Sequence, residues 1–151
     1  MKDKTPKGVD PFQAGIIKGN PYERAMKRTV RGKIVVVHDL KLDNRGYKLI
    51  PSPSRVVLSS EIHELISTDE DKAQPGREVN SAGIIGFAEF TVGGVLAAGD
   101  TVTIGAKEIG PIAGFDESHA PNHLNIIIKT PEKASGFDLR IELEDDLIIS
   151  R

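Results

Sequence analysis

Apolar and polar residues alternate, or form short β-branched runs, over most of the chain after Arg31. GKIVVVHDL is such a run, and YKLI and RVVLSS follow it, separated by the turn-forming stretches DNRG and PSPS. The same signal recurs downstream in GIIGFAEFTV, GVLAAGDTVTIG, EIGPIAGF, LNIIIK, FDLRIELE and DLIIS. About seven to nine short strands with little helix predict a mainly β protein. We expect a small closed or partly open β-barrel, with a β-sandwich as the runner-up.

One of these strands shows the alternation most clearly. In FDLRIELE every second residue is apolar, and the residues between them are charged. Because side chains of a strand point to its two faces in turn, the pattern predicts one face in the core and one in solvent. The residues predicted to face the core are Phe137, Leu139, Ile141 and Leu143.

The N-terminal thirty residues differ from the rest of the chain. Residues 1–19 are rich in Gly, Pro and Lys and have few apolar anchors, which is typical of a flexible or partner-bound arm. NPYERAMKR then predicts a short helix, because Asn20 can cap it, Pro21 suits its first position and Glu23 fits a capping box. We therefore divide the chain into a basic N-terminal arm with a short helix (1–30) and a single β-barrel domain (31–151).

Two segments between the predicted strands are not clear strands. SSEIHELIS fits either a short helical turn, from the spacing of Ile62, Leu65 and Ile66, or a continued strand, and we favour the helical turn. The next stretch, STDEDKAQPGREVNS (67–81), is polar and has no periodicity. Loops of this length in compact domains are usually functional or disordered. We expect loop 67–81 to be a lid over a site or a partner-contact loop.

Composition excludes several classes of function. The chain has 151 residues, enough for one domain with a core of its own, and it contains no cysteine. The absence of cysteine excludes disulfide frameworks, thiolate nucleophiles and Cys-ligated zinc or iron–sulfur centres. No apolar run approaches the roughly 18 residues of a membrane-spanning helix, and the N-terminus does not resemble a signal peptide. We expect a soluble cytoplasmic protein without membrane partners.

Charge is distributed unevenly along the chain. Residues 1–33 carry nine Lys and Arg against three acids, a net charge of +6, whereas residues 34–151 carry 11 against 19, a net charge of −8. An arm and a body of opposite charge, together with apolar runs such as KIVVV and NIII that need cover on both faces, predict a homo-oligomer. The acidic body and the lack of a set of stacking aromatics argue against nucleic-acid binding.

The segment GFDESHAPNHLNIII (114–128) is the strongest candidate for a site. It holds two of the four histidines of the chain, four residues apart. Pro121 between them opposes a helix, so we expect a loop from Asp116 to Asn122 that leads into a strand from His123 to Lys129. In that strand one face belongs to the core and the other carries polar groups. The core face holds Leu124, Ile126 and Ile128, and the opposite face holds His123, Asn125 and Ile127.

This segment offers two kinds of chemistry. As a metal site, two imidazoles with one or two carboxylates form the nitrogen and oxygen set that zinc, manganese or iron prefers; the candidate ligands are His119, His123, Asp116 and Glu117. As a metal-free site, His123 or His119 would act as a general base oriented by Asp116, while Asn125 or Asn122 polarises a carbonyl. The candidate catalytic residues are then His123, Asp116 and Asn125.

A structural reading of the same segment stays open. Asp, Ser, Pro and Asn are ordinary turn residues, and a histidine can lie in a subunit interface. The sequence therefore supports two hypotheses. The protein is either a small-molecule-binding protein or enzyme with its site in residues 115–125, or a non-enzymatic structural or accessory subunit of a homo-oligomer. Whether catalysis takes place stays undecided at this level.

Other motifs carry less. HEL at His63 and Glu64 lacks the second histidine of a zincin helix, since Ser67 occupies that position. His38 at a predicted strand end fits a structural hydrogen bond, and Arg77 in the polar loop fits a solvated arginine. GGVLAAGDTVTI resembles the strand, Gly-Asp turn, strand unit of small β-barrel domains such as the barrel of translation factors. This resemblance covers about a dozen residues and implies a turn geometry only.

Overall fold

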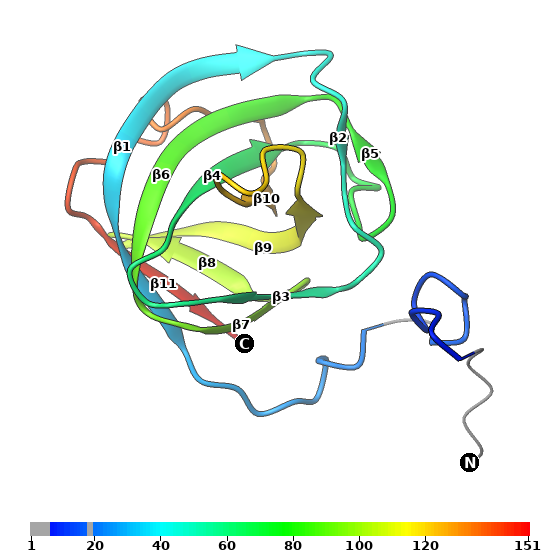
Figure 1. The fold of residues 1–151 in the computed structure, drawn as a ribbon. Coiled ribbons are helices and arrows are strands. Elements are labelled where there is room, and N and C mark those ends of the chain that lie inside the picture. Colours follow the sequence, from blue (N-terminus) through cyan, green and yellow to red (C-terminus); the bar gives the residue numbers. More distant parts are fainter. Residues whose placement is uncertain (1–6, 18–19) are drawn as a thin grey trace.

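The computed structural model describes residues 7–17 and 20–151, and its centre is a closed β-barrel (Figure 1). The order around the barrel is β1, β11, β8, β9, β10, β4 and β6, and β6 pairs with β1 to close the ring. Neighbouring barrel strands are antiparallel, except that β4 and β10 are parallel. The barrel strands are β1 (Val30–Leu42), β4 (Ile62–Thr68), β6 (Ala82–Val92), β8 (Thr101–Ile104), β9 (Lys107–Asp116), β10 (Asn125–Lys129) and β11 (Asp146–Ser150).

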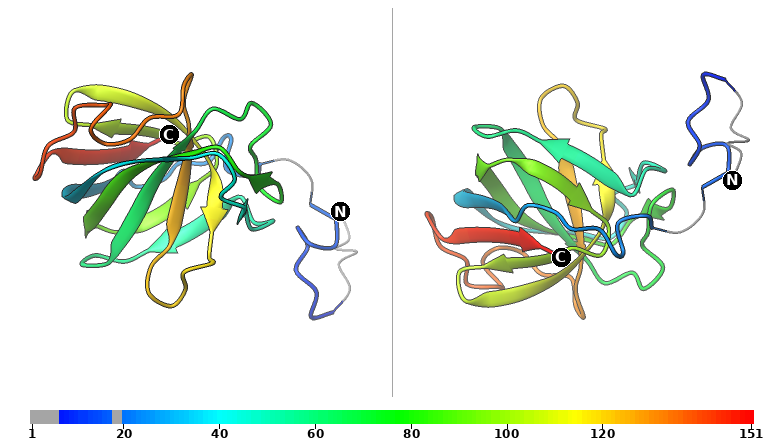
Figure 2. Two further views of the ribbon diagram at one scale, coloured as in Figure 1. Left: turned by 90° about the horizontal axis from the view of Figure 1, so that it is seen from above. Right: turned by 90° about the horizontal axis from the view of Figure 1, so that it is seen from below.

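Two short pairs of strands flank the barrel. β2 (Tyr47–Lys48) pairs with β5 (Glu78–Val79), and β3 (Ser54–Val57) pairs with β7 (Gly94–Ala97). Figure 2 shows the molecule from above and from below the view of Figure 1, with residues 7–17 outside the barrel. The predicted closed β-barrel is thus confirmed, and the β-sandwich is not formed.

Apolar residues form two clusters on the two sides of the barrel wall. The first fills the interior and includes Leu124, Ile126 and Ile128, as their alternation predicts. The second lies on the outer surface, where Ile66 and Ile127 are fully buried. The cover of this outer cluster comes from β2, β5 and the segments beside them, through Tyr47, Leu49, Ala73 and Val79. The two-sided apolar character of β10 is therefore satisfied within one chain.

Loop 67–81 forms part of this cover. The loop begins in the last residues of β4 and contains β5, and it buries Ala73 and Val79 against the outer cluster. The Glu70 carboxylate fastens its far end, because Oε2 accepts hydrogen bonds from the backbone N–H groups of Asn80 (2.6 Å) and Ser81 (2.7 Å). The polar sequence hid this role, since only two apolar side chains make the contact.

The closing strands β1 and β6 are long and strongly bent. Their pairing changes register three times, and Gly86 of β6 lies at one of the irregular positions with φ +151°. A Cβ at Gly86 would collide with the carbonyl oxygen of Val36 on β1. Only glycine permits this close crossing of the two backbones, which lets the sheet curl into a small barrel.

The expected short helices are wrong: none of the described residues is in a helix. SSEIHELIS forms β4, and its apolar spacing misleads because Leu65 faces the interior while Ile66 faces the outer cluster. NPYERAMKR makes only turns, and a helix so short is unstable without tertiary support. Nothing helical in the described chain has the length and apolarity to cross a membrane.

The predicted strand FDLRIELE is also wrong. Residues 137–144 form consecutive turns between Gly136 and β11, and the side chains of Phe137 and Leu143 are about 60% exposed, at 61% and 62%. Arg140 and Glu144 adopt positive φ of 57° and 69°, which a strand cannot contain. Only Ile141 is buried. Local backbone and side-chain hydrogen bonds thus outweigh the alternating pattern in this segment.

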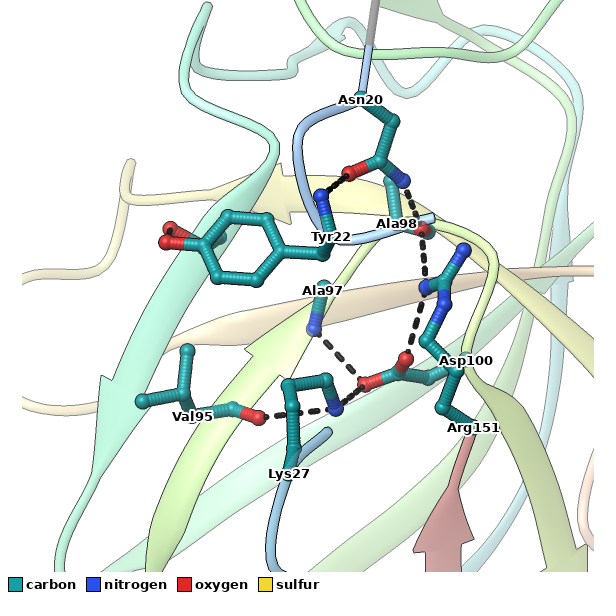
Figure 3. A network of polar contacts seen from close by, with 9 residues as sticks. Asn20, Tyr22, Lys27, Val95, Ala97, Ala98, Asp100 and Arg151 are labelled. Carbon is teal, nitrogen blue, oxygen red and sulfur yellow. Dashed lines mark hydrogen bonds and ion pairs between the residues drawn. The ribbon is translucent and has the colours of Figure 1, made fainter. Parts of the chain in front are cut away.

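The N-terminal segment is fastened to the barrel through one carboxylate, Asp100, in the turn between β7 and β8 (Figure 3). Asp100 is fully buried, and its oxygens accept from Lys27 Nζ (2.7 Å), Arg151 (3.0 Å) and the N–H of Ala97 (2.9 Å). We call Asp100, Lys27 and Arg151 the Asp100 network. Asn20 adds a hydrogen bond to the carbonyl of Ala98. The predicted arm of residues 1–19 falls partly outside the described residues, which omit 1–6 and 18–19.

Candidate functional site

A row of side chains crosses the outer face of four neighbouring strands. The strand register places Phe87 of β6 opposite Glu64 of β4, Glu64 opposite Asn125 of β10, and Asn125 opposite Asp116 of β9. Their neighbours Leu65 and Ile126 face the interior, so these four side chains face outward. Residues 117–124 form the loop that joins β9 to β10 next to this row, and they bring both histidines to it.

Glu64, His119 and His123 converge at this row, and we call them the histidine cluster. His119 Nδ1 lies 3.2 Å from His123 Nε2, and His123 Nε2 lies 3.5 Å from Glu64 Oε1. One ligand atom from each residue lies within 4.8 Å of the other two. Glu64 is 8% exposed and the side chain of His123 is 11% exposed, whereas His119 is exposed. The cluster is therefore half sealed and open on one side.

These separations match the geometry of a metal site. Zinc binds histidine nitrogen and carboxylate oxygen at about 2.0–2.2 Å, so two ligands of a tetrahedral ion are about 3.3 Å apart. The separations of 3.2 and 3.5 Å bracket that value. Two imidazoles and one carboxylate are also the ligand set of catalytic zinc and of non-haem iron sites with open positions.

The ring of His123 is held on two further sides. Asn122 Nδ2 lies 2.8 Å from His123 Nδ1, and Phe87 contacts the ring edge-on with 5.0 Å between centroids. A partner on the second ring nitrogen fixes the orientation of a ligating imidazole and decides which nitrogen is available. The other nitrogen of His123, Nε2, faces Glu64 and His119; a metal ion on Nε2 would require the proton on Nδ1 and the Asn122 amide turned so that Oδ1 accepts from it.

Asp116 does not contact the two histidines; it holds the loop. Its carboxylate accepts from the N–H of Lys48 (2.8 Å), the N–H and hydroxyl of Ser118 (3.0 and 2.5 Å) and Nδ2 of Asn125 (3.0 Å). Burial alone would raise the pKa of Asp116, but these hydrogen bonds outweigh it and leave the pKa below its ordinary value. Asp116 is therefore ionised, and its oxygens are already occupied.

Asn125 has an unsatisfied oxygen at the centre of the row. Its Nδ2 donates to Asp116 and lies 3.3 Å from His119 Nδ1, while Oδ1 is buried without a hydrogen-bond partner. The Asp116 carboxylate fixes this orientation, because a flipped amide would bring two oxygens together. An orphan acceptor of this kind destabilises a fold by about 1–3 kcal/mol. Among the side chains described, no other buried nitrogen or oxygen lacks a partner.

Arg45 and Tyr47 border the cluster on the side of β2. The guanidinium carbon of Arg45 lies 4.2 Å above the Tyr47 ring, and one of its nitrogens lies 3.2 Å from His119 Nε2. Tyr47 is 1% exposed, and this burial raises its pKa to about 12. The phenol therefore stays protonated at neutral pH. Both residues are 70 positions or more from the histidines in the sequence, which gave no sign of their proximity.

Glu117 turns away from the histidines. Its Oε2 pairs with Nε of Arg55 at 3.0 Å, on the opposite side of the loop. There a cavity of about 190 Å³ is lined by both of these residues, by Asn122 and His123, and by His63 and Glu61. His123 thus belongs both to the histidine cluster and to the wall of this cavity.

The comparisons with known proteins give a family but no activity. Residues 24–150 match the model of a family of unknown function, DUF6917. The chain belongs to this family. No curated protein and no solved structure matches it. In this DUF6917 protein the function must therefore be argued from the site.

The two other histidines of this DUF6917 protein have structural surroundings. His63 accepts the Leu124 N–H on Nδ1 (2.9 Å), contacts Phe90, and lies with Nε2 3.2 Å from Glu61. Burial is the main reason that the pKa of His63 is lowered. The ring of His38 lies edge-on to Phe87, with 6.1 Å between ring centroids.

Of the residues proposed from the sequence, the structure brings His119, His123 and Asn125 together. Asp116 is bonded to Asn125, and Glu117 is paired with Arg55. The acid it adds is Glu64. The sequence held one usable signal for Glu64, an acid beside apolar residues in IHELI. The HEL motif suggests an incomplete zinc-binding helix, whereas β4 places Glu64 on the outer face of the barrel, two residues before Ile66.

Proposed function

We propose that this protein binds one divalent metal ion through His119 Nδ1, His123 Nε2 and Glu64, and that the ion binds and activates a small molecule. The observation behind the proposal is that ligand atoms of two histidines and a buried carboxylate converge within 4.8 Å, with His123 at 3.2 Å from His119 and 3.5 Å from Glu64, near an orphaned amide oxygen. Zinc, manganese and iron(II) all suit this set of two nitrogens and one carboxylate.

The surrounding residues have separate roles in this proposal. A divalent ion held by three protein ligands would leave positions open for water or substrate and would supply Lewis-acid chemistry and an activated water at neutral pH. Asn125 Oδ1 supplies an acceptor for a proton of a bound water or ligand, which removes the cost of the orphan. Asp116 positions Asn125 and the loop that carries both histidines. The reaction class is metal-assisted hydrolysis or addition.

The metal-free reading uses the same residues in another way. His123 would act as the general base, but its carboxylate neighbour is Glu64 at 3.5 Å, whereas Asp116 is engaged by Lys48, Ser118 and Asn125. In this reading His123 would act as the general base, Asp116 would anchor the loop, and Asn125 would polarise a substrate carbonyl. Metal content separates the two readings.

The test is metal analysis and calorimetric titration of the untagged protein. Chelator-treated wild-type protein is titrated with Zn²⁺, Mn²⁺ and Fe²⁺ in anaerobic buffer, beside a His119→Ala, His123→Ala double variant and Glu64→Gln. We expect one ion per chain and a loss of about 100-fold or more in affinity in both variants, since each removes ligands. His38→Ala is the matched control, because it removes a histidine outside the cluster. Equal binding in the double variant and the control would overturn the proposal.

A second candidate, a non-enzymatic subunit of a homo-oligomer, is favoured by exposed apolar side chains. Val56, Leu58 and Ile62 lie within seven positions of one another and are 54%, 63% and 46% exposed. Exposed groups of this kind are typical of interfaces. Light scattering of wild type and Leu58→Asp tests it: a dimeric or larger mass that falls to the monomer in the variant supports it, and a monomeric wild type refutes it.

A further inference from the structure

The guanidinium of Arg45 lies at the edge of the histidine cluster and has no acidic partner among the described residues. Its side chain is half-buried, lies 4.2 Å above the Tyr47 ring and reaches His119 Nε2 at 3.2 Å. The backbone N–H of Arg45 is bonded to the carbonyl of Asn80, which fixes where the side chain starts. Within residues 7–17 and 20–151, no carboxylate lies within ion-pair distance of it.

A guanidinium without an acidic partner is common among the described arginines, and what sets Arg45 apart is its place on an aromatic ring beside a histidine. Arg55 pairs with Glu117, and Arg151 pairs with Asp100. Those two guanidinium groups are neutralised within the chain. Arg45 instead directs one N–H group at the His119 imidazole and stacks on the Tyr47 ring. This arrangement orients a cation for an incoming anion.

Metal binding at His119 would release this donor. An imidazole that gives its Nδ1 lone pair to an ion carries its proton on Nε2, and a nitrogen that bears a proton cannot accept from Arg45. The guanidinium and the His119 Nε2–H group would then both be donors at the edge of the His119 ring that does not hold the ion. Two converging donors next to a cation form a site for an oxyanion.

The charges around the site favour an oxyanion that carries a single negative charge. A divalent ion and Arg45 contribute three positive charges, and Glu64 and the ionised Asp116 contribute two negative charges. One positive charge is left, which a monoanion balances. A carboxylate also has the planar pair of oxygens that a guanidinium binds through two parallel hydrogen bonds.

We propose that the ligand of this site is a small carboxylate that accepts hydrogen bonds from the Arg45 guanidinium and from the Nε2–H group of the metal-bound His119, so that the ion favours its binding through the His119 tautomer. This inference rests on the proposed metal site, and it names the substrate class of that site. It makes Arg45 a specificity-determining residue that does not ligate the ion. Metal and carboxylate should then bind cooperatively, each raising the affinity for the other.

Calorimetric titration with zinc in the presence of chosen anions tests the inference. Chelator-treated full-length protein is titrated with Zn²⁺ alone, with acetate, with the neutral isostere acetamide, and with the dianion sulfate. We expect acetate to raise the zinc affinity several-fold or more, while acetamide leaves it unchanged and sulfate raises it less. In Arg45→Gln we expect zinc to bind as in wild type and the several-fold effect of acetate to disappear, leaving acetate at the level of acetamide.

Each other outcome has a defined meaning. Acetate coupling that survives in Arg45→Gln, or acetamide equal to acetate in wild type, overturns the carboxylate inference and leaves the metal site standing. A larger effect of sulfate than of acetate overturns the monoanion. Absence of zinc binding in wild type overturns the metal site and this inference together. Arg45→Lys, which keeps the charge and loses the fork, replaces Arg45→Gln if that variant is unfolded, and Arg77→Gln is the matched control for loss of an exposed arginine.

Discussion

The Asp100 network and the histidine cluster both centre on a buried carboxylate, but they differ in how completely that carboxylate is satisfied. Asp100 is fully buried between two cations and a backbone N–H, and its partners come from the two ends of the chain. Glu64 is nearly as buried, yet its neighbours are two histidines, one of them exposed, next to an orphaned amide oxygen. A complete network stabilises the fold. We attribute the incomplete one to a ligand that binds there, as in the proposed metal site.

We therefore expect substitution of Asp100 to lower the stability of the fold strongly and substitution of Glu64 to leave it nearly unchanged. Asp100→Ala leaves Lys27 and Arg151 beside a vacated, buried position, and breaking such a network lowers the free energy of unfolding by about 3–5 kcal/mol. Denaturant titration measures the loss, with Asp43→Ala as control, since the side chain of Asp43 is 94% exposed beside Lys133. The control should not differ from wild type. A loss under about 1 kcal/mol in Asp100→Ala would show that the network is dispensable.

Asp116 stands between the two cases, because it is a satisfied carboxylate that serves the incomplete cluster. Asp116→Asn exchanges an acceptor for a donor facing Lys48 N–H and Ser118, which we expect to lower the free energy of unfolding by about 1–3 kcal/mol. The same change should weaken zinc binding by about 10–100-fold, as loss of an outer-shell partner does. Denaturation and calorimetry on one preparation measure both. Unchanged zinc affinity would mean that the loop does not depend on Asp116.

Glu64→Gln should separate binding from stability. Without metal, Glu64 has one long contact to His123 at 3.5 Å, so we expect the free energy of unfolding to stay within about 1 kcal/mol of wild type. Zinc should raise the melting temperature of wild type and leave that of Glu64→Gln unchanged, because only a ligand that binds the native state stabilises it. A marked loss of stability in the metal-free variant would place Glu64 with Asp100 as a structural residue.

The smallest expected effect is a pH dependence that comes from His63. Its pKa is lowered in the folded state, so the unfolded chain binds the proton more readily. Stability from this residue is therefore complete above the ordinary pKa of about 6.5 and falls as the pH drops from there toward the folded-state pKa. We expect His63→Gln to have a flatter stability profile than wild type between pH 7 and 5, roughly the window of this titration. Parallel profiles would contradict the neutral, buried His63.

Much of this fold could be predicted from local pattern. The runs of β-branched residues predicted the barrel, and the order of residues 123–129 correctly placed Leu124, Ile126 and Ile128 in the core and Asn125 on the other face. FDLRIELE shows the limit of this approach. Its alternation is clean, but positive φ at Arg140 and Glu144 interrupts any strand there.

The site could be predicted only where its residues are neighbours in sequence. His119, His123 and Asn125 come from one loop and the strand after it. Glu64 reaches them through the parallel pairing of β4 with β10, and no local pattern encodes that pairing. Arg45 reaches the cluster because the segment that contains Tyr47 packs over the outer apolar cluster, and this segment is equally remote in sequence. Long-range strand order, rather than composition, completes the cluster.

The most direct test of the account is to locate the ion itself. Crystals of the chelator-treated protein would be soaked in Zn²⁺, and data collected on both sides of the zinc absorption edge would give an anomalous difference map. We predict one strong peak at about 2.0–2.2 Å from His119 Nδ1, His123 Nε2 and a Glu64 oxygen. A map without density at these three residues, at a zinc concentration that occupies other surface sites, would contradict it.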